Sequence, residues 1–309
     1  MLFHGSPSVK RASRGETLGP VRSPLEPPVG ARVAATGGLA AARSPSGGRA
    51  PEVGWDADEA SRRAREVLGA SRAITVLTGA GISTDSGIPD YRGPTGRWTL
   101  DPGAGATSKL ADYLSDPGVR ARAWRDRLVS PVWSARPNAG HRALVDLERQ
   151  GRLRALLTQN IDRLHQRAGS SEEAVVELHG SMFGVRCWSC DARATMTEAL
   201  EAVRAGDPDP HCPACGGVLG STAVSFGQPL DPAVLARAEQ AATDCDAFVA
   251  VGTTLRVNPA AALVPRALEA GAAVVIVNAD PTPHDALAEA VVRAPIGEVL
   301  PRLLAAPEG

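Results

Sequence analysis

Lysine is almost missing from this chain of 309 residues, which holds only Lys10 and Lys109. Arginine supplies nearly all of the positive charge, and the formal net charge of −1 gives no global field that would attract nucleic acid or a membrane surface. No uninterrupted apolar run reaches the roughly 18 residues of a membrane helix. The first ten residues also lack the charged and apolar regions of a secretory signal. We therefore expect a cytoplasmic protein without a membrane segment or a specific nucleic-acid site.

Residues 1–54 contain few large apolar side chains and are rich in Pro, Gly, Ser, Arg and Ala. Such a segment buries too little apolar surface to offset the entropy lost on ordering it. We expect a disordered low-complexity tail. Alternatively, part of it is an artefact of a translation start assigned too far upstream. A basic interaction arm is the alternative.

Short apolar runs alternate with helical patterns from residue 55 onward, and each run stops at glycine or polar residues. This alternation predicts an α/β fold, with a Rossmann-like parallel sheet and helices on both faces. In such sheets the ligand crevice lies outside the carboxyl ends of the strands, so the polar clusters are expected to meet there. The expected strands are 74–77, 153–157, 175–178, 247–251 and 273–277, and the expected helices are 58–68, 141–149, 232–241 and 260–270.

A glycine-dotted stretch, TGAGISTDSGIPDYRG, follows the first expected strand at residues 78–93. Gly79 and Gly81 allow the backbone to pass close to a ligand. A glycine turn between a strand and a helix start binds phosphate, because unpaired N–H groups point outward. The usual dinucleotide fingerprint, G-x-G-x-x-G, would require glycine in place of Thr84. The stretch therefore predicts a different nucleotide loop, with an ordinary tight turn as the alternative.

Four of the five cysteines form two C-x-x-C pairs, separated by a gap in the range expected for two zinc knuckles. Four thiolates bind Zn²⁺ tetrahedrally and leave no open position for a catalytic water, so the predicted zinc is structural. Disulfides or unrelated cysteines are the alternative, and Cys245 is expected in the core. The predicted ligands are Cys187, Cys190, Cys212 and Cys215.

Several polar side chains follow the expected strands. His179 precedes a glycine, and its ordinary pKa near 6.5 suits a general base; a structural histidine is the alternative. Gln159, Asn160 and Asp162 could bind a carboxamide or a ribose, or could cap a helix. Residues 224–227 alternate in polarity, which fits pairing with an extended peptide or an ordinary sheet strand.

Taken together, these motifs closely resemble the sirtuin family over about residues 55–303. The stretch 122–125 and Tyr91 look most like the branch that includes the mitochondrial type-4 human member. The matching motifs are GAGIS at 79–83, GIPDYR at 87–92, TQNID at 158–162, HG at 179–180, the four cysteines, VSFG at 224–227, GTTL at 252–255 and Asn278.

The resemblance implies NAD⁺-dependent removal of acyl groups, of the deacetylase type, from lysines of protein substrates. The acyl oxygen would attack C1′ of the nicotinamide ribose, and nicotinamide would leave. His179, with Asn160 as the second catalytic residue, would then activate a ribose hydroxyl toward the resulting imidate. The products would be lysine, nicotinamide and O-acyl-ADP-ribose. Mono-ADP-ribosyl transfer to protein and a catalytically silent zinc-stabilised NAD⁺ scaffold are the alternatives.

The resemblance also implies a binding role for each matched residue. The phosphates would be bound by Gly79, Ala80, Gly81 and Ser83, and a mobile closing loop would carry Asp90, Tyr91 and Arg92. The nicotinamide end would be bound by Gln159, Asn160, Ile161 and Asp162, and the adenosine side by Gly252, Thr253, Thr254, Asn278 and Ile296. The substrate would be bound by Val224, Phe226 and Gly227.

The expected catalytic domain, 55–309, has a large NAD⁺-binding part and a small part formed by two insertions. The large part comprises 55–86, 137–182 and 222–309; the small one comprises a helical module, 87–136, and a zinc ribbon, 183–221. We expect a monomer. The Y-x-x-R pair that marks succinyl- and malonyl-removing sirtuins is absent, because Asp116 follows Tyr113 at that spacing. This absence disfavours acidic acyl groups.

Overall fold

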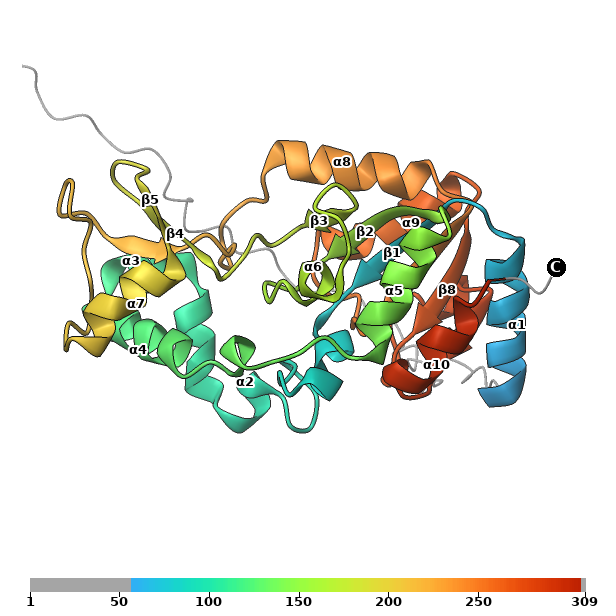
Figure 1. Ribbon diagram of the computed structural model, residues 1–309, viewed down its shortest axis with the longest axis horizontal. Coiled ribbons are helices and arrows are strands. Elements are labelled where there is room, and N and C mark those ends of the chain that lie inside the picture. The colour runs from blue at the N-terminus through green and yellow to red at the C-terminus, as the bar shows by residue number, and fades with distance from the viewer. Residues whose placement is uncertain (1–56, 307–309) are drawn as a thin grey trace, which may run out of the picture. The chain divides into compact units, whose positions relative to one another are not determined.

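A computed structural model describes residues 57–306, so the predicted tail at 1–54 lies outside the described residues. The larger sheet has six parallel strands in the order β3-β2-β1-β7-β8-β9 (Figure 1). Their bounds are β1 Ile74–Thr78, β2 Leu153–Thr158, β3 Val175–Glu177, β7 Ala247–Val251, β8 Ala273–Val277 and β9 Ala290–Val292.

The strand order confirms the predicted Rossmann-like sheet. The chain proceeds outward from β1 through β2 to β3, then returns to β7 on the other side of β1 and proceeds to β9. The order therefore reverses between β1 and β7, and the carboxyl ends of strands at such a reversal open a ligand crevice. The sequence does not predict β9, because three apolar residues are too short a run to show a period.

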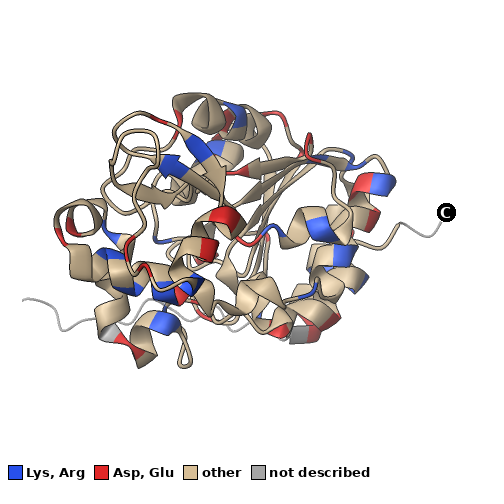
Figure 2. Ribbon diagram, turned by 60° about the vertical axis from the view of Figure 1, so that its left-hand side comes forward, with Lys and Arg blue, Asp and Glu red and all other residues tan. Residues whose placement is uncertain are grey.

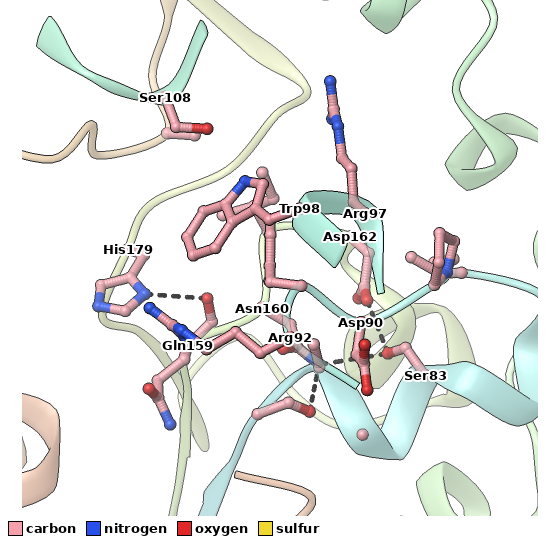
Figure 3. A pocket seen from close by; sticks show the side chains of 18 of the residues that line it. Ser83, Asp90, Arg92, Arg97, Trp98, Ser108, Gln159, Asn160, Asp162 and His179 are labelled. Atoms are coloured by element: carbon pink, nitrogen blue, oxygen red, sulfur yellow. Dashed lines mark hydrogen bonds between the residues drawn. The ribbon is translucent and has the colours of Figure 1, made fainter. Parts of the chain in front are cut away.

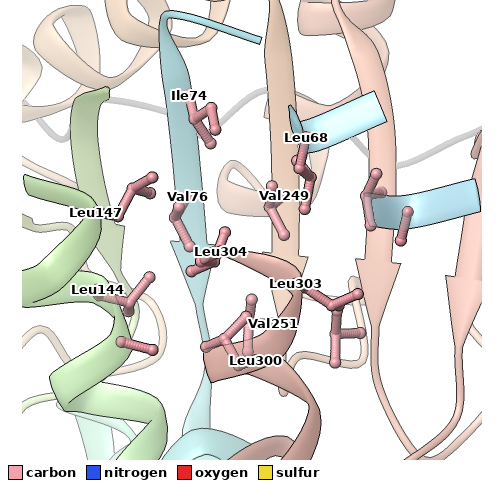
Figure 4. Packing of buried hydrophobic residues seen from close by; sticks show 14 of the residues in the cluster. Leu68, Ile74, Val76, Leu144, Leu147, Val249, Val251, Leu300, Leu303 and Leu304 are labelled. Atoms are coloured by element: carbon pink, nitrogen blue, oxygen red, sulfur yellow. The ribbon is translucent and has the colours of Figure 1, made fainter. Parts of the chain in front are cut away.

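Helices cover both faces of this sheet. On one face, α1 (Ala57–Ala70), α5 (Ala139–Arg149) and α10 (Ile296–Leu303) pack on β1 and β7 through Leu68, Leu144 and Leu300 (Figure 4). On the other face lie α8 (Pro232–Thr243) and α9 (Leu263–Glu269), preceded by the 3₁₀ turn η4 (Ala260–Ala262). Since every residue of β1 is buried, each of its aliphatic side chains contributes about 1.5–3 kcal/mol by leaving water.

The segments that interrupt the alternation form a separate set of elements. The first carries α2 (Arg97–Leu100), η2 (Pro102–Ser108), α3 (Leu110–Ser115), α4 (Pro117–Leu128) and η3 (Pro131–Trp133). The second carries an antiparallel sheet of order β5-β4-β6, with β4 Gly184–Cys187, β5 Arg193–Thr195, β6 Leu219–Ser221 and the helix α7 (Met196–Arg204). Trp124 of α4 is fully buried in one cluster with Cys187, Cys212 and Met196, so the two segments share a core.

A buried ion pair also joins these two segments. Arg120 of α4 donates from Nε to both carboxylate oxygens of Asp209, at 3.0 and 2.8 Å, and from Nη1 to the carbonyls of Tyr113 and Leu114. Both side chains of the pair are largely removed from water. A guanidinium buried in this way needs such a full set of acceptors. The contact unites the helical module with the cysteine-bearing segment, although the predicted domain boundaries stay predictions.

Basic and acidic residues are interspersed along the helices of the described part of the chain (Figure 2). Among residues 57–306, no helix is both long and apolar enough to cross a membrane. The remaining short helices are η1 (Ala80–Ser86), α6 (Leu164–Ala168) and η5 (Asp285–Leu287).

Candidate active site

A cleft of about 950 Å³ lies at the carboxyl ends of the parallel strands. Gly79 follows β1, Gln159 follows β2, Gly252 follows β7 and Asn278 follows β8, and all four residues line the cleft. Every residue predicted for cofactor, substrate or catalysis lines the same cleft. The expected convergence of the strand ends therefore occurs, while the role of each residue stays a proposal.

The glycine turn after β1 packs directly on the turn after β7. Gly79 N–H donates to the Val251 carbonyl at 3.0 Å, and Gly81 N–H donates to the Gly252 carbonyl at 2.9 Å. A Cβ at Gly79 would lie 2.7 Å from the Gly252 carbonyl oxygen, which is too close for any side chain. The glycines are thus required by backbone-to-backbone packing, and the turn continues into the 3₁₀ helix η1.

Asn160 and Asp162 tie this turn to the end of β2 (Figure 3). Asn160 Nδ2 donates to the Gly79 carbonyl at 3.0 Å and to Ser83 Oγ at 3.2 Å, and Ser83 Oγ donates to Asp162 Oδ2 at 2.7 Å. The other carboxylate oxygen of Asp162 accepts from Leu164 N–H at 2.9 Å, although the N-cap position of α6 is Arg163 rather than Asn160 or Asp162. Burial raises the pKa of Asp162. Both hydrogens of the Asn160 side-chain amide are engaged, so its Oδ1 is the atom of this side chain that can accept from a ligand.

His179 stands at the end of β3 with its ring at the cleft (Figure 3). Its Nδ1 lies 3.1 Å from the Gln159 carbonyl oxygen. A carbonyl can only accept, so Nδ1 carries the hydrogen and Nε2 keeps a free lone pair. Burial lowers the pKa of His179, and the hydrogen bond to Gln159 opposes that shift. The His179 ring is therefore held in one orientation, and its lowered pKa favours the neutral form at physiological pH.

Two buried histidines behind the cleft were not assigned by the sequence. His165 Nε2 lies 2.9 Å from Thr78 Oγ1, and that hydroxyl donates to Thr158 Oγ1, which accepts from the backbone N–H of Asn160. His141 contacts His165 with ring centroids 5.0 Å apart and the two ring planes tilted by 54°. Burial lowers the pKa of His141 to about 4 and that of His165 well below its ordinary value, so both rings stay neutral.

The predicted closing loop folds onto Trp98, a residue for which the sequence predicts no role. Tyr91 packs on Trp98 with ring centroids 4.9 Å apart, and the Arg92 guanidinium lies 4.7 Å from the same ring (Figure 3). Trp98 also contacts Phe226, with ring centroids 5.5 Å apart. Trp98 therefore links the loop to the predicted substrate segment. Only the fold reveals this, since Trp98 and Phe226 are far apart in the sequence.

The predicted substrate segment, 224–227, is hydrogen-bonded to two neighbouring stretches of backbone and to its own following turn. Phe226 donates to the Ser108 carbonyl at 2.8 Å and accepts from Leu110 N–H at 3.0 Å, while Val224 donates to the His179 carbonyl at 2.8 Å. The segment is an isolated bridge rather than an ordinary sheet strand. The segment then turns: Gly227 has a positive φ of 87°, and the Gln228 N–H donates to the Ser225 carbonyl at 3.0 Å.

The four predicted metal ligands form a tight cluster, with all four Sγ atoms within 4.8 Å of one another. Cys187 Sγ lies 3.5 Å from Cys215 Sγ, and Cys190 Sγ lies 3.7 Å from Cys212 Sγ. Tetrahedral zinc with bonds of about 2.3 Å places sulfurs roughly 3.8 Å apart, so the cluster fits that ion.

Comparison with known proteins assigns the family. The Sir2 family model matches residues 79–259. The chain belongs to the Sir2 family, the sirtuins. The NAD-dependent protein deacetylase 2 of Streptomyces coelicolor is 51% identical to this sirtuin over 75% of this chain and 96% of the relative. The NAD-dependent protein deacylase 2 of Pyrobaculum aerophilum is 40% identical over 77% of this chain and 92% of its own.

Solved Sir2 structures share the fold of this sirtuin. One, described as showing the mechanism and regulation of Sir2 enzymes, has a TM-score of 0.74 at 39% identity and covers 80% of this chain and 97% of its own. A complex of Sir2 with a p53 peptide and NAD⁺ has a TM-score of 0.69 at 33% identity. The match covers 77% of this chain and 95% of the solved one. The predicted sirtuin fold and family are thus confirmed, and the predicted branch within the family stays a prediction.

Proposed function

We propose that this sirtuin removes acyl groups from lysine side chains of proteins and consumes NAD⁺ as co-substrate. One observation carries the proposal: His179 presents an unprotonated Nε2 to the cleft that is also lined by the glycine turn of η1. The names of the relatives as NAD-dependent deacetylases and deacylases support it. A monomeric state and a cytoplasmic location are predictions that accompany it.

In this proposal the cleft binds NAD⁺ in an extended form across the strand ends. The turn at Gly79–Ser83 takes the phosphates at the N-terminal end of η1; since the Gly79 and Gly81 N–H groups already donate to backbone carbonyls, the contacts come from the remaining donors of the turn. Gly252, Thr253, Thr254, Asn278 and Ile296 take the adenosine side. Asn160 and Asp162, held rigidly by Ser83, orient the nicotinamide end together with Gln159 and Ile161. NAD⁺ supplies an activated ribose carbon, and a rigid site spares the reaction the entropy of aligning it.

His179 acts as the general base. With Nδ1 fixed on the Gln159 carbonyl, Nε2 takes a proton from a ribose hydroxyl, which then accepts the acyl group. In the overall reaction, acyl-lysine, NAD⁺ and one water give lysine, nicotinamide and O-acyl-ADP-ribose. The loop carrying Asp90, Tyr91 and Arg92 closes over the site through Trp98 and excludes bulk water. The segment of Val224, Phe226 and Gly227, which is anchored to the His179 carbonyl, binds the substrate backbone beside the base.

Incubation with NAD⁺ and a peptide carrying acetyl-lysine tests this function. We expect equal amounts of deacetylated peptide, nicotinamide and O-acetyl-ADP-ribose, measured by mass spectrometry. ADP-ribose bound covalently to protein would instead indicate mono-ADP-ribosyl transfer. Absence of NAD⁺ consumption with every acyl peptide would indicate a silent scaffold. Either result would refute the deacylase proposal.

The pH profile provides an independent prediction. Because burial lowers the pKa of His179, the base stays unprotonated as the pH falls through 6.5 and is protonated only in more acidic solution. We expect kcat/KM to be lost on an acid limb whose midpoint lies below 6.5. The measurement is kcat/KM for one acetylated peptide between pH 5 and pH 9. A midpoint above 6.5 would contradict the assignment of the buried His179 as the base.

A further inference from the structure

Three buried polar side chains form a chain of hydrogen bonds that ends at the backbone of Asn160. His165 of α6 places Nε2 2.9 Å from Thr78 Oγ1, and Thr78 Oγ1 lies 2.9 Å from Thr158 Oγ1. Thr158 Oγ1 accepts from the Asn160 N–H at 3.1 Å. We call His165, Thr78 and Thr158 the hydroxyl relay. None of the three lines the cleft, so the relay acts on the cleft only through the backbone that it holds.

The hydrogens of the hydroxyl relay can be assigned. The Thr78 hydroxyl donates its one hydrogen to Thr158 Oγ1, so its oxygen accepts from Nε2–H of His165. Burial lowers the pKa of His165 well below its ordinary value, so the ring is neutral and Nδ1 carries no hydrogen. His165 is thus the donor that fixes the direction of the Thr78 hydroxyl.

His141 of α5 favours this form of the His165 ring. His141 Nδ1 accepts from the Asn138 backbone N–H at 3.3 Å, so Nε2 carries the hydrogen of this neutral ring. His141 Nε2 and His165 Nδ1 are both buried without a partner among the described residues, and the ring centroids lie 5.0 Å apart. The other tautomer of His165 would bury a second N–H group without an acceptor, which native proteins avoid. The pair of rings therefore keeps Nε2–H directed to Thr78.

The segment that the hydroxyl relay holds carries both groups that the proposed reaction must align. The Gln159 carbonyl accepts from His179 Nδ1 and orients the base, and the Gln159 N–H donates to the Thr78 carbonyl at 2.9 Å. Asn160, whose backbone ends the relay, takes the nicotinamide end in the proposal. Because a misplacement of about 1 Å can cost roughly 10²-fold in rate, side chains that fix this segment affect the reaction without touching its substrates.

The histidine is an unfavourable choice if position 165 serves packing alone. Burying a polar ring costs free energy unless its hydrogen bonds are made, so an apolar side chain would fill the same space more favourably. His165 instead leaves Nδ1 without a partner while Nε2 serves Thr78. Resting on the proposed function, we infer that His165 is a positioning residue that acts through Thr78 and Thr158 on the nicotinamide end of the cleft.

Removal of the Thr78 hydroxyl at nearly constant shape tests the relay. In Thr78→Val, kcat for an acetylated peptide and the rate of exchange of labelled nicotinamide into NAD⁺ should both fall about 3- to 10-fold, the effect of one lost hydrogen bond. The KM for the peptide should stay within about two-fold of the wild type, because the loss concerns the nicotinamide end. Wild-type kcat and exchange rate in Thr78→Val would overturn the inference.

Thr75→Val is the matched control. Thr75 lies on the same strand, is equally buried and donates to the Ala241 carbonyl at 2.7 Å, but it lies outside the cleft and the relay. This variant should lower the melting temperature about as much as Thr78→Val does and keep wild-type kcat. An equal loss of kcat in both variants would show a general effect of destabilising β1 and would overturn the inference.

Variants of His165 locate the origin of the relay. His165→Phe removes the donor and should reproduce the losses of Thr78→Val, whereas His165→Gln offers an amide N–H near the position of Nε2 and should recover most of the activity. The double variant His165→Phe, Thr78→Val should lose no more kcat than the slower single variant, because both changes break the same hydrogen bond. Losses that multiply, or equal losses in His165→Gln and His165→Phe, would show that the ring only fills space. If His165→Phe fails to fold, the comparison of Thr78→Val with Thr75→Val decides.

Failure of this inference is distinguishable from failure of the proposed function. Turnover of the acetylated peptide by the wild type, with wild-type kcat in Thr78→Val, would leave the deacylase in place and remove the relay. No turnover of any acyl peptide by the wild type would remove both.

Discussion

The His179→Ala variant should lose deacylation while it still binds NAD⁺. General-base catalysis contributes about 10²- to 10⁴-fold to a rate, so kcat should fall by at least that range. The side chain touches the protein mainly through one hydrogen bond to the Gln159 carbonyl, and the proposed NAD⁺ contacts belong to other strands. Binding should therefore survive the change. Single-turnover assays would measure the rate, and calorimetric titration would measure the affinity for NAD⁺.

His211→Ala is the matched control for this experiment. His211 is exposed and lies outside the cleft, with Nδ1 near the Asp209 carbonyl. The control should keep wild-type kcat. Full activity in His179→Ala would refute the assignment of the base, and loss of NAD⁺ binding would show that His179 has a binding role instead.

The sheet could be predicted because its residues express one physical pattern. The stretches that form β1, β2 and β7 are short, apolar and bounded by glycine or polar residues, as strands buried on both faces must be. The β9 triplet follows the same rule but is too short for a period to appear. At residues 80–86 the sequence predicted a helix start, and the structure forms a 3₁₀ helix there, because this turn is constrained by its packing against Gly252.

The residues of the cleft could be predicted where chemistry and chain position coincide. His179, Asn160 and Gly252 follow strands, so their meeting is a consequence of parallel topology. Trp98 and Arg127 could not be found in this way. Each lies in the helical segment between β1 and α5, where no strand fixes direction, and each acquires its contacts only from tertiary packing.

The cysteine cluster connects the stability of the small elements to the cleft. Cys187 and Cys212 share a buried core with Trp124, and Trp188 stands between the two ligands of the first pair. Trp188 lines the cleft, and Trp124 lies beneath the guanidinium of Arg127, which lines it too. A metal in this cluster would therefore hold this part of the cleft wall as well as the local fold.

Removal of zinc should unfold these small elements and abolish activity. Binding of structural zinc contributes about 10–16 kcal/mol in small zinc domains, more than the net stability of most domains. We expect one zinc ion per chain by elemental analysis. Treatment with a chelator should lower the melting temperature and expose Trp124 and Trp188 to solvent, as followed by tryptophan fluorescence. Cys212→Ser should reproduce both effects, because it leaves three thiolates and removes a buried sulfur.

Cys245→Ser provides the matched control, since Cys245 is also buried but packs under the sheet helices and lies outside the cluster. This variant should keep one zinc ion per chain, and its tryptophan fluorescence should match that of the wild type. An unchanged melting curve in chelator, or full zinc content in Cys212→Ser, would contradict a structural site. Because the sheet has its own core around β1 and β7, the zinc-free protein should retain the helices and strands of that core. Retained far-UV circular dichroism with lost tryptophan protection is thus the specific signature expected of zinc removal.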